Sequence, residues 1–244
     1  MPKTTFEHVD EQADLAVRTY STWPIWKYTI PYPSTVLMGS SGTPDLGIFL
    51  AVGSVWAQVI THFMPNGATI LDVGCGCSKT ARFLAPDPRI KSYFGLDPMR
   101  DCIDWSNRYV SPLTDGRFIF EHVDLHSDEY NPNGKIRAET YRFPVASDSV
   151  CIVIGASLFT HLLEPAAKQY LNETGRVLKS EGHAVFSLHT QPANGLNFSG
   201  DEGRVDIDLD YFLSLADKAG LELQEDLGSV CGQETVVLVK KTGL

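Results

Sequence analysis

The stretch Thr69-Ile70-Leu71-Asp72-Val73-Gly74-Cys75-Gly76-Cys77-Ser78 joins a short apolar run to a loop that contains two glycines. A helical pattern follows at Lys79–Leu84. Glycines let a backbone turn tightly and approach a ligand closely, and the N-terminus of the next helix offers free N–H groups. The stretch therefore predicts a strand, a ligand-binding loop and a helix, in that order.

Strands and helices alternate through the rest of the chain. Apolar runs predict strands over residues 68–73, 91–96, 117–123, 149–156 and 184–188, and helical spacing predicts helices over 79–84, 99–110, 165–178 and 209–219. We expect a further helix after Thr43-Pro44-Asp45, a turn at Ser180-Glu181-Gly182, a solvated loop over 200–208, and a final strand pair over 221–226 and 234–240. Such alternation indicates a parallel sheet with helices on both faces, whose ligands bind at the carboxyl ends of the strands.

Residues 1–43 differ from the rest of the chain. They hold a cluster of aromatic residues and prolines: Tyr20, Trp23, Pro24, Trp26, Tyr28, Pro31, Tyr32 and Pro33. Repeated prolines argue against a long regular element. We therefore predict an N-terminal extension over 1–43, either a lid over a site or a packed extension, and a ligand-binding domain over 44–244.

The charge of the 244-residue chain disfavours two kinds of partner. Lys and Arg number 20 against 30 Asp and Glu, which gives a net charge of −10. Nucleic-acid binding without sequence preference needs a basic surface, and so does binding to an anionic membrane.

The sequence also indicates a compartment. No run approaches the 18 or so unbroken apolar residues of a membrane-spanning helix, and the first ten residues lack the apolar core of a signal peptide. The five cysteines follow no disulfide pattern. We predict a reduced, cytoplasmic protein.

The glycine loop fits some cofactors better than others. A dinucleotide loop, G-x-G-x-x-G, would need its third glycine at Lys79, where a bulky side chain opposes close packing. Asp72 would repel a pyrophosphate but suits a cationic amino-acid ligand. A phosphate-binding P-loop is excluded because no G-x-x-x-x-G-K-[ST] is present.

Five segments in order carry a family resemblance. Leu71–Gly76 is followed by Tyr93-Phe94-Gly95-Leu96-Asp97, whose acid stands 21 residues after Gly76, and then by Phe143–Val150, Leu158–Leu162 and Glu173–Gly182. Together they resemble the class I S-adenosylmethionine (SAM) dependent methyltransferases, closely over about residues 66–190. Two positions depart from the family pattern, Cys77-Ser78 at the usual third small residue and Cys151 at a common acid. The resemblance implies a Rossmann-like, doubly wound sheet of seven strands, mostly parallel with an antiparallel last strand.

The resemblance also implies a set of cofactor contacts. The backbone of Gly74, Cys75 and Gly76 would lie against the methionine part of SAM, with Asp72 near its ammonium group. Asp97, followed by Pro98, would accept hydrogen bonds from both ribose hydroxyls. The remaining implied contacts are Asp124 and Leu125 at the adenine, and Ala156 and Ser157 beside the methionine.

Two histidines are candidates for a general base. Methyl transfer to a hydroxyl needs removal of a proton, and His is the commonest base near pH 7. His161 follows the fourth strand and His189 ends the fifth, so both fall at the expected ligand edge. The alternative for His161 is a helix cap or a pairing with Glu164.

A metal site is a weaker interpretation of two other segments. His122, Asp124 and His126 would share one face of an ideal strand, and His and Asp are suitable ligand types. Asp124, however, is already assigned to adenine. Acids over residues 201–206 could hold Mg²⁺ but read more naturally as a solvated loop. We therefore predict no metal and keep Mg²⁺ as an alternative.

The sequence thus predicts a SAM-dependent methyltransferase that acts on a small molecule and releases S-adenosylhomocysteine. O-methylation of a sugar, glycan-type or secondary-metabolite hydroxyl is the favoured reaction. N- or C-methylation of a small molecule, and a non-catalytic SAM-binding regulator, remain alternatives. We expect no nucleic-acid or membrane partner, and a homodimer is one option for assembly.

Overall fold

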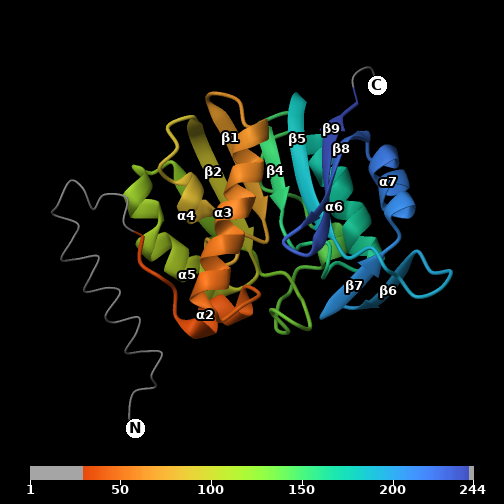
Figure 1. Cartoon of the computed structure of the whole chain (residues 1–244), viewed down its shortest axis with the longest axis horizontal. Coiled ribbons are helices and arrows are strands. Elements are labelled where there is room, and N and C mark those ends of the chain that lie inside the picture. The colour runs from red at the N-terminus through yellow and green to blue at the C-terminus, as the bar shows by residue number, and fades with distance from the viewer. Residues whose placement is uncertain (1–29, 242–244) are drawn as a thin grey trace, which may run out of the picture.

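A computed structural model describes residues 30–241 as a seven-stranded sheet flanked by helices (Figure 1). The strand order is β3-β2-β1-β4-β5-β9-β8. Strands β1 to β5 pair in parallel, and β9 runs antiparallel to both of its neighbours. This confirms the predicted fold class. The strand bounds are β1 Ala68–Val73, β2 Ile90–Asp97, β3 Phe118–His122, β4 Val150–Gly155, β5 Leu178–Leu188, β8 Leu221–Val230 and β9 Gln233–Lys240.

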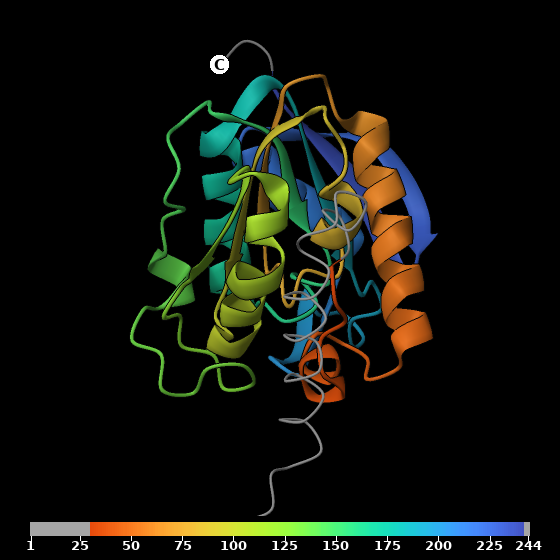
Figure 2. The same cartoon turned by 90° about the vertical axis from the view of Figure 1, so that its left-hand side faces the viewer.

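Helices cover both faces of the sheet. The bounds are α3 Leu46–Phe63, α4 Ala81–Leu84, α5 Arg100–Tyr109, α6 Glu164–Val177 and α7 Leu209–Lys218. Figure 2 shows α3, in orange, and α6, in teal, on opposite sides of the sheet. Helices α3, α4 and α5 contribute to one apolar cluster, and α6 and α7 to a second.

The central strands are apolar on both sides because each side meets one of these clusters. Ile70 packs into the cluster under α3, and its neighbour Leu71 packs into the cluster under α6. Both side chains are buried. Alternation of side chains between two covered faces explains why β1 and β4 read as near-continuous apolar runs.

Helix α3 begins where the sequence predicts. The Asp45 side chain caps it by accepting a hydrogen bond from the Ile48 N–H at 2.8 Å. Phe49 and Trp56 are buried on its inner side. By length and mean hydropathy (1.6), α3 is the one helix within residues 30–241 that could cross a bilayer, although a core helix of a soluble protein passes the same test.

Two segments differ from the sequence prediction. Residues 180–182 do not end an element, because β5 runs from 178 to 188 and bulges there: Val150 pairs with Leu178, and Ile152 with His183. A Cβ on Gly182 would lie 2.9 Å from the Cys151 carbonyl oxygen, so glycine permits this close approach. The predicted loop over 200–208 is largely a hairpin of β6 (Phe198–Asp201) and β7 (Arg204–Ile207).

Three segments meet at the carboxyl edge of the parallel strands. They are helix α2 (Thr35–Ser40), the long connection between β3 and β4, and the β6–β7 hairpin, all at the lower side of Figure 1. The aromatic residues at positions 20–28 lie outside the described residues. The predicted boundary at residue 43 stays a prediction.

Candidate functional site

A cavity of about 1060 Å³ opens at this carboxyl edge. This volume exceeds the usual range of about 300–1,000 Å³ for a pocket that holds one small ligand. Its wall is built from the ends of β1, β2 and β4, the connection after β3, the end of α2 and Glu202 of the hairpin. The cavity therefore has room for a cofactor and a second small molecule.

The loop after β1 presents its backbone to this cavity. The N–H groups of Gly74 and Cys75 both donate to the Leu96 carbonyl, at 2.8 and 3.1 Å, which fixes the loop against β2. Gly76 has φ +52°, and a Cβ there would lie 2.8 Å from Ser41 Oγ. Conformation and space therefore both favour glycine at position 76.

Asp97 ends β2 as a buried carboxylate at the cavity wall. Its Oδ2 accepts the Gly76 N–H at 2.7 Å, and its Oδ1 accepts the Met99 N–H at 2.8 Å. Burial raises the pKa of Asp97 from 3.8 to about 6, although the two N–H donors act to lower it. Each carboxylate oxygen keeps a further lone pair for a ligand.

Asp72 is a second buried acid, at the end of β1. The Tyr93 hydroxyl donates to one of its oxygens. Burial is the largest cause that raises the pKa of Asp72, to about 7, and the nearby Asp97 adds to it. Lys79 acts in the opposite direction. Two buried carboxyl groups, with too little positive charge nearby to balance both, thus face one cavity.

Lys79 and Ser41 join helix α2 to the glycine loop. The Lys79 ammonium group donates to the Ser41 carbonyl at 2.9 Å, and the Cys77 N–H donates to Ser41 Oγ at 3.2 Å. Sequence reasoning used Lys79 only to exclude a dinucleotide loop and did not single out Ser41. The sequence signal that could have indicated Ser41 is the small-residue turn Gly39-Ser40-Ser41-Gly42, and all four of these residues line the cavity.

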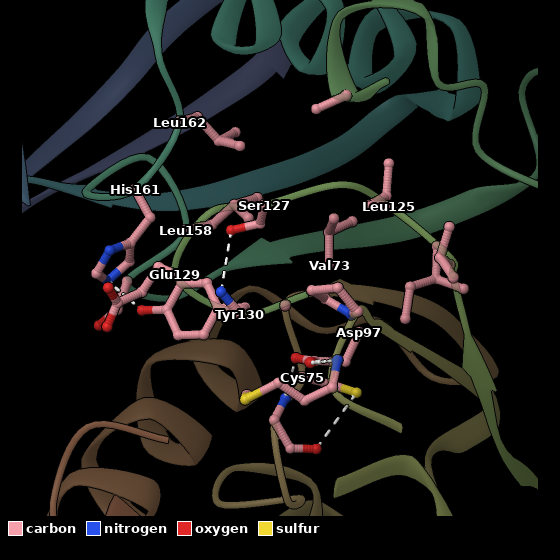
Figure 3. A pocket seen from close by; sticks show the side chains of 18 of the residues that line it. Val73, Cys75, Asp97, Leu125, Ser127, Glu129, Tyr130, Leu158, His161 and Leu162 are labelled. Carbon is pink, nitrogen blue, oxygen red and sulfur yellow. Dashed lines mark hydrogen bonds between the residues drawn. The ribbon is translucent and has the colours of Figure 1, made fainter. Parts of the chain in front are cut away.

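The opposite wall carries His161, in the segment after β4. Figure 3 shows its ring beside the Tyr130 hydroxyl, with Glu129 close by. His161 Nε2 lies 3.0 Å from the Tyr130 hydroxyl, and Nδ1 lies 2.7 Å from the Glu202 carbonyl oxygen. An imidazole is thus held at the cavity wall from both ring nitrogens.

Comparison with known proteins places this geometry in a family. Residues 71–186 match the family described as "Methyltransferase domain". This match supports a SAM-dependent methyltransferase and is consistent with the class I family. The matched segment begins in β1 and ends in β5, so it spans the loop, both buried acids and His161.

Solved structures of low sequence identity share the methyltransferase fold. A TehB-like SAM-dependent methyltransferase from Corynebacterium glutamicum has 18% identity and a TM-score of 0.55, covering 96% of this chain and 99% of that one. A SAM-dependent methyltransferase from Aquifex aeolicus has 18% identity and a TM-score of 0.54, covering 75% and 88%. The [4+2]-cyclase SpnF has 14% identity and a TM-score of 0.57, covering 78% and 81%. At these identities the likeness establishes the fold only, and the chemistry must be argued from the site.

The cavity of this methyltransferase fits SAM. A cationic amino acid suits the undercompensated acid Asp72, and a pair of ribose hydroxyls suits the open lone pairs of Asp97. Of the residues that the sequence assigns to the cofactor, all but one line the cavity: Asp72, Gly74, Cys75, Gly76, Asp97, Pro98, Leu125, Ala156 and Ser157. Their individual roles stay predictions.

Asp124 and His189 are the two predicted site residues that do not line the cavity. Asp124 Oδ1 accepts a hydrogen bond from Asn131 Nδ2 at 3.3 Å, while the neighbouring Leu125 faces inward. The His189 carbonyl accepts the Ile207 N–H at 2.7 Å, which places this residue beside the hairpin. Burial lowers the pKa of His189, and Arg204 adds to the effect.

The segment considered for a metal does not bring its side chains together. His122 Nδ1 lies 3.1 Å from Arg100 Nη2, and His122 Nε2 lies 3.1 Å from the Pro98 carbonyl oxygen. His126 Nε2 instead lies 3.5 Å from Asp128 Oδ1. Within residues 30–241, no three His, Cys, Asp or Glu side chains are grouped closely enough to hold a metal ion.

Proposed function

We propose that this methyltransferase transfers a methyl group from SAM to a hydroxyl on a small molecule, with His161 as the general base. The acceptor class is a sugar, glycan-type compound or secondary metabolite. One observation carries the proposal: His161 lines the cavity beside the end of β4, where its ring is oriented by a backbone carbonyl. A general base must lie within reach of the proton that it removes.

The cofactor occupies the half of the cavity next to the glycine loop. Asp97 accepts hydrogen bonds from the ribose hydroxyls, and Asp72 faces the ammonium group. Leu125 lies beside the adenine, and Ala156 and Ser157 lie beside the methionine chain. Their common place on the cavity wall supports this assignment. A ligand cation near Asp72 and hydroxyl donors at Asp97 compensate the two acids that burial leaves undercompensated.

Bound SAM supplies a methyl group on a positively charged sulfur. The residues of this chain position the acceptor and remove its proton. Since the Glu202 carbonyl can only accept, His161 Nδ1 carries the hydrogen of the neutral ring and Nε2 is left as the basic nitrogen. Holding donor and acceptor in one cavity also contributes much of the rate, because positioning two reactants replaces a bimolecular encounter.

Several features support a small, soluble acceptor. The net charge of −10 opposes nucleic acid, and the cavity has room for only a small second molecule. The five cysteines are free thiols, as is usual in the reducing cytoplasm, which is the compartment that we propose.

The test measures transfer of labelled methyl from SAM to a panel of sugars, phenols and amines. We expect a hydroxyl compound to be methylated, and His161→Gln to lower that rate by about 10²–10⁴-fold. A larger loss in His189→Gln than in His161→Gln would assign the base to His189. Transfer to amines alone, unchanged in His161→Gln, would replace the proposal with N-methylation. Binding of S-adenosylhomocysteine without transfer to any compound would favour a non-catalytic SAM-binding protein.

A further inference from the structure

Tyr130 lies beside the proposed base, His161, at the cavity wall. It belongs to the connection between β3 and β4, lines the cavity and places its hydroxyl 3.0 Å from His161 Nε2 (Figure 3). The ring planes of the two residues are nearly perpendicular, at 88°, with centroids 5.2 Å apart. The Tyr130 hydroxyl therefore reaches the histidine ring at its edge, where the nitrogen lone pair lies.

The direction of this hydrogen bond follows from the other end of the ring. Nδ1 of His161 donates to the Glu202 carbonyl, since a carbonyl oxygen has no hydrogen to give. In the neutral imidazole Nε2 is then an acceptor, so the Tyr130 hydroxyl is the donor. The basic nitrogen of His161 is thus already occupied by a phenol, whose oxygen keeps lone pairs for a second partner.

Tyr130 itself stays protonated at neutral pH. Burial raises the pKa of Tyr130 to about 12, and the negative charges of Glu129, Asp97 and Glu202 add to the rise. A resting phenolate is therefore not the base. The hydroxyl can pass a proton only if another group accepts one at the same time, and His161 is in place to do so.

Glu202 holds both members of the pair through different atoms. Its carbonyl accepts from His161, while its carboxylate accepts from Ser127 Oγ and from the Asp128 N–H, both at 2.7 Å. Ser127 Oγ in turn accepts the Tyr130 N–H at 3.2 Å. One hairpin residue thus fixes the separation of the Tyr130 and His161 side chains.

We propose that Tyr130 is a catalytic residue that receives the acceptor's proton while its own proton passes to His161, and that Glu202 is the positioning residue for this pair. The inference rests on the proposed O-methylation. The acceptor O–H bond breaks as an O–H bond forms on Tyr130, and the original Tyr130 O–H bond breaks as an N–H bond forms at His161 Nε2. The electron pair released on the acceptor oxygen forms the new bond to the methyl carbon, and the sulfur keeps the electron pair of the bond that breaks. The positive charge ends on the imidazolium, whose Nδ1–H faces the Glu202 carbonyl.

The first experiment does not require the acceptor. Protein with ¹⁵N-labelled histidine and bound S-adenosylhomocysteine is studied by NMR, and the His161 signals are identified by their loss in His161→Gln. We expect a protonated Nδ1 and an unprotonated Nε2, with an Nε2 signal that moves in Tyr130→Phe. Tyr211→Phe is the matched control, because it removes a hydroxyl bonded to Glu164, and neither of these residues lines the cavity. A protonated Nε2, or an Nε2 signal equally unmoved in both variants, overturns the relay.

The second experiment measures methyl transfer to a hydroxyl compound found with the panel. Tyr130→Phe and His161→Gln should each lower the rate by about 10²–10⁴-fold, and the double variant should be no slower than the worse single variant, because the two residues act as a unit. Affinity for S-adenosylhomocysteine should not change. Glu202→Ala should lower the rate and Glu202→Gln should restore part of it, since an amide oxygen can still accept from Ser127.

The outcomes separate the two proposals. Full activity of Tyr130→Phe toward a hydroxyl compound overturns the relay and leaves O-methylation standing. Transfer by the wild type to amines alone overturns the proposed function and removes the need for a proton relay. A fall in S-adenosylhomocysteine affinity in Tyr130→Phe, equal to the fall in rate, would make Tyr130 a cofactor-binding residue and overturn the relay as well.

Discussion

Replacing Asp97 by asparagine should stabilise the folded protein at pH 8 and weaken its binding of S-adenosylhomocysteine. The wild-type carboxylate is buried, and its pKa rises from 3.8 to about 6. A rise of about 2 at about 1.36 kcal/mol per pKa unit makes the charged form about 3 kcal/mol less favourable in the folded protein. Asparagine is uncharged and so avoids this penalty, although its amide oxygen can accept only one of the two backbone N–H groups that the carboxylate accepts.

The sign of the effect depends on pH. The folded protein holds the Asp97 proton more tightly than the unfolded chain, so protonation contributes stability that is fully present below about pH 4. That contribution is lost as the pH rises through about 6. We therefore expect the free energy of unfolding of Asp97→Asn, relative to the wild type, to rise by up to about 3 kcal/mol between pH 4 and pH 8, and to exceed that of the wild type at pH 8.

Urea unfolding at both pH values measures the stability, and calorimetry at pH 8 measures binding. The affinity for S-adenosylhomocysteine should fall by about 1–3 kcal/mol, the scale of hydrogen bonds to a charged group. Asp104→Asn, exposed on α5, is the control for the change in net charge. A wild type more stable than Asp97→Asn at pH 8 would refute the reasoning, because the two backbone N–H bonds would then outweigh desolvation. Unchanged binding would refute the role at the ribose.

Two further substitutions, each with a matched control, test the loop and the core. Gly76→Ala and Gly67→Ala should each lower the free energy of unfolding by about 1–2 kcal/mol, because both glycines have a left-handed backbone. A Cβ at position 76 would meet Ser41, whereas a Cβ at position 67 would meet nothing within 4 Å. Only Gly76→Ala should therefore also weaken S-adenosylhomocysteine binding, by about tenfold in calorimetry. Equal binding by both variants would show that the contact with Ser41 does not matter. Phe159→Ala should lower the free energy of unfolding by about 3–5 kcal/mol. The Phe159 ring is fully buried, and its centroid lies 4.8 and 5.0 Å from the ring centroids of two other phenylalanines. Ile119→Ala, at an exposed side chain, should change the free energy of unfolding by no more than about 0.5 kcal/mol. Similar losses in the last two variants would contradict the assigned core.

The sequence predicts the sheet because its signals are local. Buried parallel strands such as Val150–Gly155 are apolar along their whole length, and turn residues bound them. Ser-Glu-Gly has the composition of a turn, so the sequence predicts a turn at Gly182, whereas the close approach of Gly182 to Cys151 is a contact between strands. The hairpin was missed because only Val205 and Ile207 of its eight strand residues are buried.

The candidate site likewise has a part that the sequence predicts and a part that it does not. Asp72 and Asp97 stand at strand ends, so a strand prediction places them at one edge. The environment of His161 depends on Tyr130 and Glu202, which are 31 and 41 residues away along the chain. No periodicity or spacing reports such a contact between loops. The sequence therefore selects a candidate base but not the groups that set its tautomer.

The β6–β7 hairpin is a two-stranded sheet separate from the main one, and its Val205 and Ile207 side chains are buried in the second apolar cluster. It pairs with itself, and few backbone hydrogen bonds tie it to its surroundings, among them Val205 N–H to the Thr160 carbonyl and Ile207 N–H to the His189 carbonyl, both at 2.7 Å. The acids of the cofactor half, in contrast, are part of the sheet itself. Under the proposed function, substitutions along this hairpin are therefore expected to change acceptor preference through Glu202, which lines the cavity, and to leave the strands of the main sheet as they are.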